Sequence, residues 1–186
     1  MVGPLNESDI SPTYTAVLMA VVAVIIGLSV LVLGLSFTEA IAQPAPLVTD
    51  TGGSLTVGPN GTQTVVLTHR GGDAVDVEAL EIVVSLSADG RNGRLMNLPV
   101  RGTNLRPTSR YVRGDPLFAT DNGSVDGVLA SEYGGNGTWS LGTDIAFNLA
   151  TTVDLAPTET VVVRVRHRPT NATIAEETLT PAPETP

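Results

Sequence analysis

The stretch "TVVVRVRHR", Thr160–Arg168, alternates apolar and basic side chains and predicts a β-strand. Successive side chains of a strand point to opposite faces, so Val163 and Val165 should share one face and Arg164 and Arg166 the other. Such a strand is half-buried, with valines turned toward a core and arginines toward solvent. The rest of the domain should therefore supply a second layer that covers the valine face.

Six further segments have the same strand character between Gly, Pro, Asn and Asp turn signals. They are "GSLTV" (53–57), "TQTVVLTHR" (62–70), "VEALEIVVSLS" (77–87), "GRLMNLPV" (93–100), "TDIAFNL" (143–149) and "TIAEETL" (173–179). Seven short strands with frequent turns predict an antiparallel β-sandwich of immunoglobulin-like outline over residues 44–180. The proline-rich end, residues 181–186, predicts a tail that is disordered or extended.

The N-terminal quarter has a different character. The 24 residues from Tyr14 to Phe37 are nearly all apolar, and about 20 such residues span a bilayer as a helix. A helix can begin at Pro12 and must end before Pro44. We therefore expect a long hydrophobic α-helix over residues 10–43 that can anchor the chain in a membrane, and an α+β fold class for the whole chain.

Small residues recur along this run at spacings that place them on one helical face. They are Ala16, Ala20, Ala23, Gly27 and Gly34. Small residues let helix backbones approach closely, so this face predicts helix–helix packing. Scattered small residues without a packing role are the alternative reading of the same pattern.

Two stretches resemble the haloarchaeal type IV pilins. One is Ser11-Pro12 followed by "AVLMAVVAVIIG" (16–27), and the other is "VVLTHRGGDAVDVEALEIVV" (65–84). The resemblance implies a leader over residues 1–9, removed between Asp9 and Ile10 by a prepilin peptidase-like enzyme, although no arginine precedes that junction. It also implies a membrane-anchored precursor that assembles with copies of itself into an extracellular filament, so that residues 10–43 are a membrane anchor before assembly and the filament core after it.

Charge and composition narrow the function classes. The formal net charge is −9, all ten basic residues are arginine, and cysteine is absent. Disulfides, thiolate metal sites and cysteine nucleophiles are thereby excluded. The acidic balance argues against nucleic acid as a partner. A lysine-free, acidic composition is typical of proteins that stay soluble in concentrated salt, where screening is strong.

Charge is also segregated along the chain. Six arginines lie between Arg91 and Arg113 without an acid, whereas residues 114–163 hold seven acids and no base. This polarity could align neighbouring copies by electrostatic complementarity, or it could be satisfied within one subunit.

Five Asn-x-Ser/Thr sequons occur, more than chance predicts for nine asparagines. Four lie in the exterior domain, at Asn60, Asn122, Asn136 and Asn171, and predict N-glycosylation of an exported surface. The fifth, Asn6, lies too near the apolar run to be used. Asn-Gly-Thr as simple turn chemistry is the competing interpretation.

Catalytic signals are few. His69 and His167 are the only histidines, and both fall in predicted strands, where a histidine is usually structural. No nucleophile motif, phosphate loop or metal-ligand spacing is present, so we expect neither an enzyme nor a metal or cofactor site.

Two functions remain. The first is a structural subunit of an extracellular pilus-like filament serving adhesion or surface attachment. The second is a monomeric, membrane-anchored surface module that binds a ligand or an envelope partner through its β-sandwich.

Overall fold

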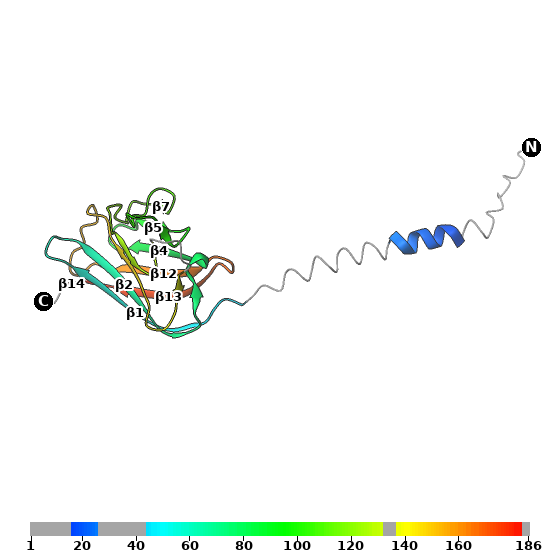
Figure 1. Cartoon of the computed structure of the whole chain (residues 1–186), viewed down its shortest axis with the longest axis horizontal. Coiled ribbons are helices and arrows are strands. Elements are labelled where there is room, and N and C mark those ends of the chain that lie inside the picture. Colours follow the sequence, from blue (N-terminus) through cyan, green and yellow to red (C-terminus); the bar gives the residue numbers. More distant parts are fainter. Residues whose placement is uncertain (1–15, 26–43, 132–136, 184–186) are drawn as a thin grey trace, which may run out of the picture. The chain divides into compact units, whose positions relative to one another are not determined.

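The computed structural model describes residues 16–25, 44–131 and 137–183. The chain divides into two units, Met1–Gln43 and Pro44–Pro186 (Figure 1). We describe each by itself, beginning with the first.

Residues 16–25 form a helix of ten residues, about 15 Å long at 1.5 Å per residue. Its seven large apolar side chains are 47–71% exposed. Within the described ranges, no helix has the length and apolar character that crossing a bilayer requires. Residues 10–15 and 26–43 of the predicted helix lie outside the described residues.

The α+β prediction is therefore wrong. Apart from this short helix and one 3₁₀ turn, the regular elements of the described residues are strands, and no long apolar helix occurs among them. The error has a physical reason. Hydropathy marks a segment that avoids water, but it does not determine the fold class, because strands account for most of the regular structure that the described residues form.

Pro44–Pro186 is built on two five-stranded sheets. The first has the order β14-β1-β2-β11-β8, and the second β13-β12-β4-β5-β7. The first sheet contains β14 (Pro181–Pro183), β1 (Val48–Val57), β2 (Gln63–Gly72), β11 (Asp144–Asn148) and β8 (Val125–Gly127). The second contains β13 (Ala172–Leu179), β12 (Val161–His167), β4 (Leu80–Leu86), β5 (Asn92–Leu95) and β7 (Val112–Gly114).

Short elements connect these sheets. The 3₁₀ turn η1 (Val77–Ala79) precedes β4, and two small pairs are formed by β3 (Val75–Asp76) with β10 (Thr138–Trp139) and by β6 (Val100–Arg101) with β9 (Ala130–Ser131). Each of the seven segments predicted as strands overlaps a strand of the structure, although 93–100 spans the end of β5, an irregular stretch and the start of β6. The strands β7 and β8 lie outside the predicted segments.

Alternation places the core between the two sheets. In β12, Val161, Val163 and Val165 are fully buried, while the residues between them are partly exposed. Strands of the other sheet contribute Val65 and Leu67 to the same apolar cluster. Removing these side chains from water is the main force that holds the two layers together.

The strand order is that of a variable-type immunoglobulin sandwich. In sequence order β1, β2, β8 and β11 occupy the positions of strands A, B, D and E. In the other sheet, the positions of strands G, F, C, C′ and C″ are occupied, in that order, by β13, β12, β4, β5 and β7. The sandwich thus forms without the disulfide that joins strands B and F in antibody domains, because the chain has no cysteine.

Of the two alternatives for the tail, disordered or extended, its start is extended. Residues Pro181–Pro183 form β14, which pairs in parallel with Leu55–Val57 of β1. Proline lacks a backbone donor and is therefore tolerated at such a sheet edge, a possibility that composition alone does not reveal. Residues 184–186 lie outside the described residues.

A pair of substitutions on β4 tests the two-layer core. Ile82 is fully buried, whereas Val83, the next residue, is partly exposed on the outer face. We expect Ile82→Ala to lower the free energy of unfolding by about 2–5 kcal/mol and Val83→Ala by less than about 1 kcal/mol. Urea unfolding of the full chain in mild detergent, followed by fluorescence of the single, buried Trp139, measures both. Equal losses would contradict the assignment of faces.

Candidate functional site

Part of the predicted packing face lies in the described helix. Ala16, Ala20 and Ala23 fall within residues 16–25 and are exposed. Gly27 and Gly34 lie outside the described residues, as do Asp9 and Ile10 of the predicted cleavage junction. The helix carries apolar side chains on all its sides, so its surface is suited to lipid or to other apolar helices and unsuited to water.

Three of the four exterior sequons are described. Asn60 is exposed in the turn between β1 and β2, and Asn122 is exposed in the turn before β8. Asn171 is exposed between β12 and β13, where its Oδ1 accepts a hydrogen bond from Arg166. Asn136 lies outside the described residues.

The two histidines are held as structural residues. His69 is fully buried, its Nε2 lies 2.9 Å from the carbonyl oxygen of Asp73, and its ring meets Trp139 edge-to-face at 4.9 Å. His167 Nδ1 lies 2.9 Å from the hydroxyl of Thr170 in the following turn. In the part of the chain that the structure describes, no three His, Cys, Asp or Glu side chains gather as a metal site would require.

Ion pairs show which acids neutralise some of the segregated arginines. On the outer face of the second sheet, Glu81 lies 3.5 Å from Arg94 and 3.9 Å from Arg166, while Glu176 lies 2.6 Å from Arg164. Two further pairs, Arg101–Glu78 and Arg91–Asp89, have distances of 2.5 Å. None of these acids comes from residues 114–163, so among the described residues the acidic segment does not neutralise the arginine-rich one.

One carboxylate has a shifted pKa. The backbone N–H of Arg91 and then its guanidinium bind the Asp89 carboxylate, which lowers the pKa of Asp89 below its ordinary value. Because the folded pKa is depressed, this stabilisation is present at neutral pH and is lost as pH falls through the folded pKa. Arg91 therefore stabilises the turn between β4 and β5, in which it lies.

Three arginines line a groove in the connection between β6 and β7. The groove has a volume of about 340 Å³ and is lined by residues 101–106 together with Thr108, Arg110 and Tyr111. We call this feature the arginine groove. Arg101, Arg106 and Arg110 supply its charge, while Thr103, Asn104 and Thr108 supply hydroxyl and amide groups.

Backbone hydrogen bonds hold the wall of the arginine groove in place. The carbonyls of Asn104 and Leu105 accept from the N–H groups of Gly123 and Val125 at 2.9 and 3.3 Å. Leu105 has a φ of 41°, an unusual conformation for a bulky residue, and its side chain packs against the core. Such a backbone persists only where surrounding contacts impose it, so the groove has a defined shape.

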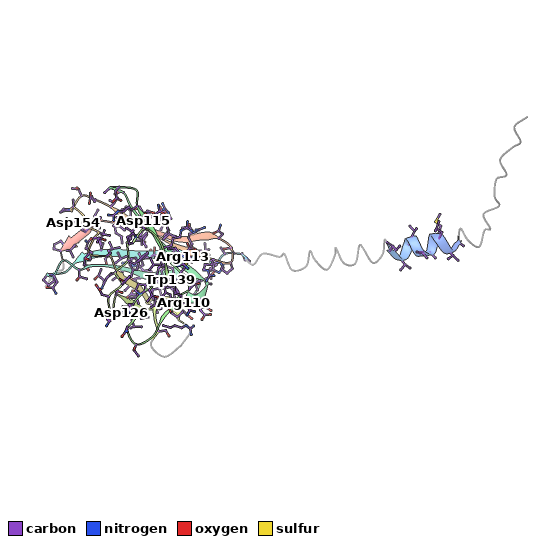
Figure 2. The ribbon with its side chains drawn as sticks, turned by 90° about the horizontal axis from the view of Figure 1, so that it is seen from above. Arg110, Arg113, Asp115, Asp126, Trp139 and Asp154 are labelled. Atoms are coloured by element: carbon purple, nitrogen blue, oxygen red, sulfur yellow. The ribbon has the colours of Figure 1, made fainter. Side chains whose placement is uncertain are left out.

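The C-terminal side of the groove is anchored in the same way. The Tyr111 ring is only 6% exposed, and its hydroxyl accepts from the backbone N–H of Arg101 at 3.2 Å. The amide of Asn97 donates to the carbonyl of Arg110 at 2.8 Å. The Arg110 guanidinium lies 5.8 Å from the Tyr111 ring centre, within cation–π range. Arg110 and Arg113 lie at the surface, whereas Trp139 lies inside the domain (Figure 2).

The arginines of the groove differ in their partners. Arg101 is paired with Glu78, whereas Arg106 and Arg110 make no ion pair with any acid that the structure describes. In the sequence these arginines form part of a basic segment, which does not predict a groove. The local sequence signals of a sharply folded loop are Gly102, whose φ in the structure is 120°, and Pro107.

In comparisons with protein-family models, with curated proteins and with solved structures, nothing matches this chain. The function of this chain is therefore inferred from its own residues.

The sequons differ in the exposure of the hydroxyl that completes each motif. Thr62 and Thr173, which follow Asn60 and Asn171, are exposed, whereas Ser124, which follows Asn122, is only 2% exposed. An enzyme that reads the motif on the folded domain can reach the first two hydroxyls more easily. Glycopeptide mass spectrometry should therefore find higher occupancy at Asn60 and Asn171 than at Asn122. Equal occupancy at all three would mean that folding does not control the modification.

Proposed function

We propose that this chain is a structural subunit of an extracellular filament and serves adhesion or surface attachment. Its apolar N-terminal segment holds the precursor in the membrane and then packs against the same segment of other copies. Its β-domain is displayed on the outside, at the cell surface. A prepilin peptidase-like enzyme processes the precursor between Asp9 and Ile10.

The observation that carries this proposal is the exposed apolar surface of residues 16–25. The side chains of Val17, Leu18 and Met19 are 60%, 61% and 71% exposed, and those of Val24 and Ile25 are similar. Leaving such side chains in water costs about 1.5–3 kcal/mol each relative to burial. Lipid before assembly and neighbouring copies after it are the surroundings that remove this cost.

The sequence pattern supports association rather than anchoring alone. Ala16, Ala20 and Ala23 lie along one side of the described helix, at spacings of four and three residues. Apolar helices in lipid gain no hydrophobic energy from pairing, so close packing over small residues provides the attraction. The exposed sequons on the β-domain fit a subunit whose outer surface faces the medium.

A monomeric, membrane-anchored surface module is the alternative. The arginine groove favours it, because a ligand groove needs no neighbouring copy to be useful. The two functions differ in what they require of the helix. An anchor requires only apolar character, whereas a filament subunit requires its small residues.

Substitutions on the helix separate these functions. We expect Ala20→Leu with Ala23→Leu to reduce the number of filaments at least tenfold, about 1.4 kcal/mol in assembly free energy, because larger side chains force the backbones apart. Val21→Leu with Val22→Leu is the matched control, since it adds methylenes on the opposite side of the helix. Electron microscopy counts the filaments, and immunoblotting of membranes checks that the precursor is still inserted. Unchanged filament number in the alanine variant would contradict packing through this face.

The mature N-terminus provides a second test. Mass spectrometry of filaments sheared from cells should find chains that begin at Ile10. Chains with an intact N-terminus, found only in membranes, would favour the anchored module instead.

A further inference from the structure

The arginine groove concentrates positive charge on a protein that is strongly acidic elsewhere. Arg106 and Arg110 are exposed, have no acidic partner among the described residues, and share a small groove with Arg101. Like charges held this close repel one another, and the loop that holds them is fixed by hydrogen bonds to residues 123–125. A bound anion would remove this repulsion without any rearrangement of the loop.

We propose that the arginine groove binds carboxylate-bearing saccharides. The planar guanidinium group offers paired N–H donors that match the two oxygens of a carboxylate, and such pairs are stronger than neutral hydrogen bonds. The guanidinium groups of Arg106 and Arg110, which have no acidic partner among the described residues, are therefore available to a uronate residue. Arg101, which is paired with Glu78 at the edge of the groove, adds to the positive potential.

The other lining residues favour a sugar over a simple anion. Thr103, Asn104 and Thr108 place two hydroxyl groups and one amide around the same groove. These groups both donate and accept, as the hydroxyl groups of a saccharide require. The volume, about 340 Å³, lies at the lower end of the range for small-molecule sites. One or two sugar units would fill it.

Rigidity of the loop also favours a binding role. The unusual φ of Leu105 is maintained by packing of its side chain and by the hydrogen bond from Val125. A loop that is already ordered loses little further entropy when a ligand binds. Affinity can therefore come from a few polar contacts.

An acidic surface on a second copy is a weaker candidate for the same groove. A stable protein–protein contact buries about 800 Å² on each partner, and such a contact would need a broad complementary face around the groove. The groove itself is small, concave and polar. The inference deepens the proposed function by naming the class of adhesion target, and it rests on that function only for the extracellular setting.

Binding to the purified full chain in mild detergent tests the inference without any need for filaments. Isothermal titration at about 0.1 M salt, where electrostatic contacts still act over about 10 Å, compares trigalacturonate with neutral galactotriose. We expect trigalacturonate to bind at least tenfold more tightly. Arg106→Gln and Arg110→Gln should each weaken binding about tenfold, as expected when a charge-assisted contact is lost. Arg164→Gln, which removes the same charge from the outer face of β12, should leave affinity unchanged.

Each contrary result has a definite meaning. Absence of trigalacturonate binding, or equal loss in the Arg164 control, would overturn the inference. Inorganic sulfate binding as tightly as trigalacturonate would reduce the groove to a general anion site and overturn the saccharide assignment. Self-association by light scattering that disappears in the Arg106 and Arg110 variants, with no saccharide binding, would assign the groove to a second copy. Filament counts in cells carrying these variants report separately on the proposed function, which predicts normal assembly.

Discussion

Burial of every second side chain between two sheets is the constraint on which the β-domain depends. In β12 and β4 it places Val163 and Ile82 inside and forces Arg164 and Glu81 onto the outer face. A shift of one residue in strand register would exchange these sets, exposing the valines and burying the charges. The same constraint therefore selects the register, holds the layers together and arranges the outer ion pairs.

Alternating burial does not determine the connection between β6 and β7, where regular strand alternation stops. There the backbone is fixed by specific hydrogen bonds and by the packing of Leu105 and Tyr111 against the domain. Loops of this kind can present polar groups in arrangements that a flat sheet cannot, because each residue takes its own backbone conformation. The arginine groove is such an arrangement, and two of its three arginines, Arg106 and Arg110, have no acidic partner among the described residues.

The two units of the chain expose side chains of opposite polarity. The β-domain hides its apolar rows and displays charge, amide and hydroxyl groups. Residues 16–25 display apolar side chains on all sides and carry no charge. A chain of this kind needs two environments at once, an apolar one for its N-terminal segment and an aqueous one for its domain. The proposed assembly of filaments at a cell surface would provide both.

The sequence by itself indicated the longer strands of the two sheets, because alternation with a period of two survives in the amino acids wherever one face is buried. It also located the sequons and the basic segment, since these depend only on residue order. Only the tertiary structure decided that β7 and β8 extend the two sheets, that Pro181–Pro183 pairs with β1, and that Arg101, Arg106 and Arg110 share a groove. The physical reason is common to all three. Each depends on contacts between residues distant in sequence or on the conformation of an irregular loop, and neither leaves a periodic pattern in the amino acids.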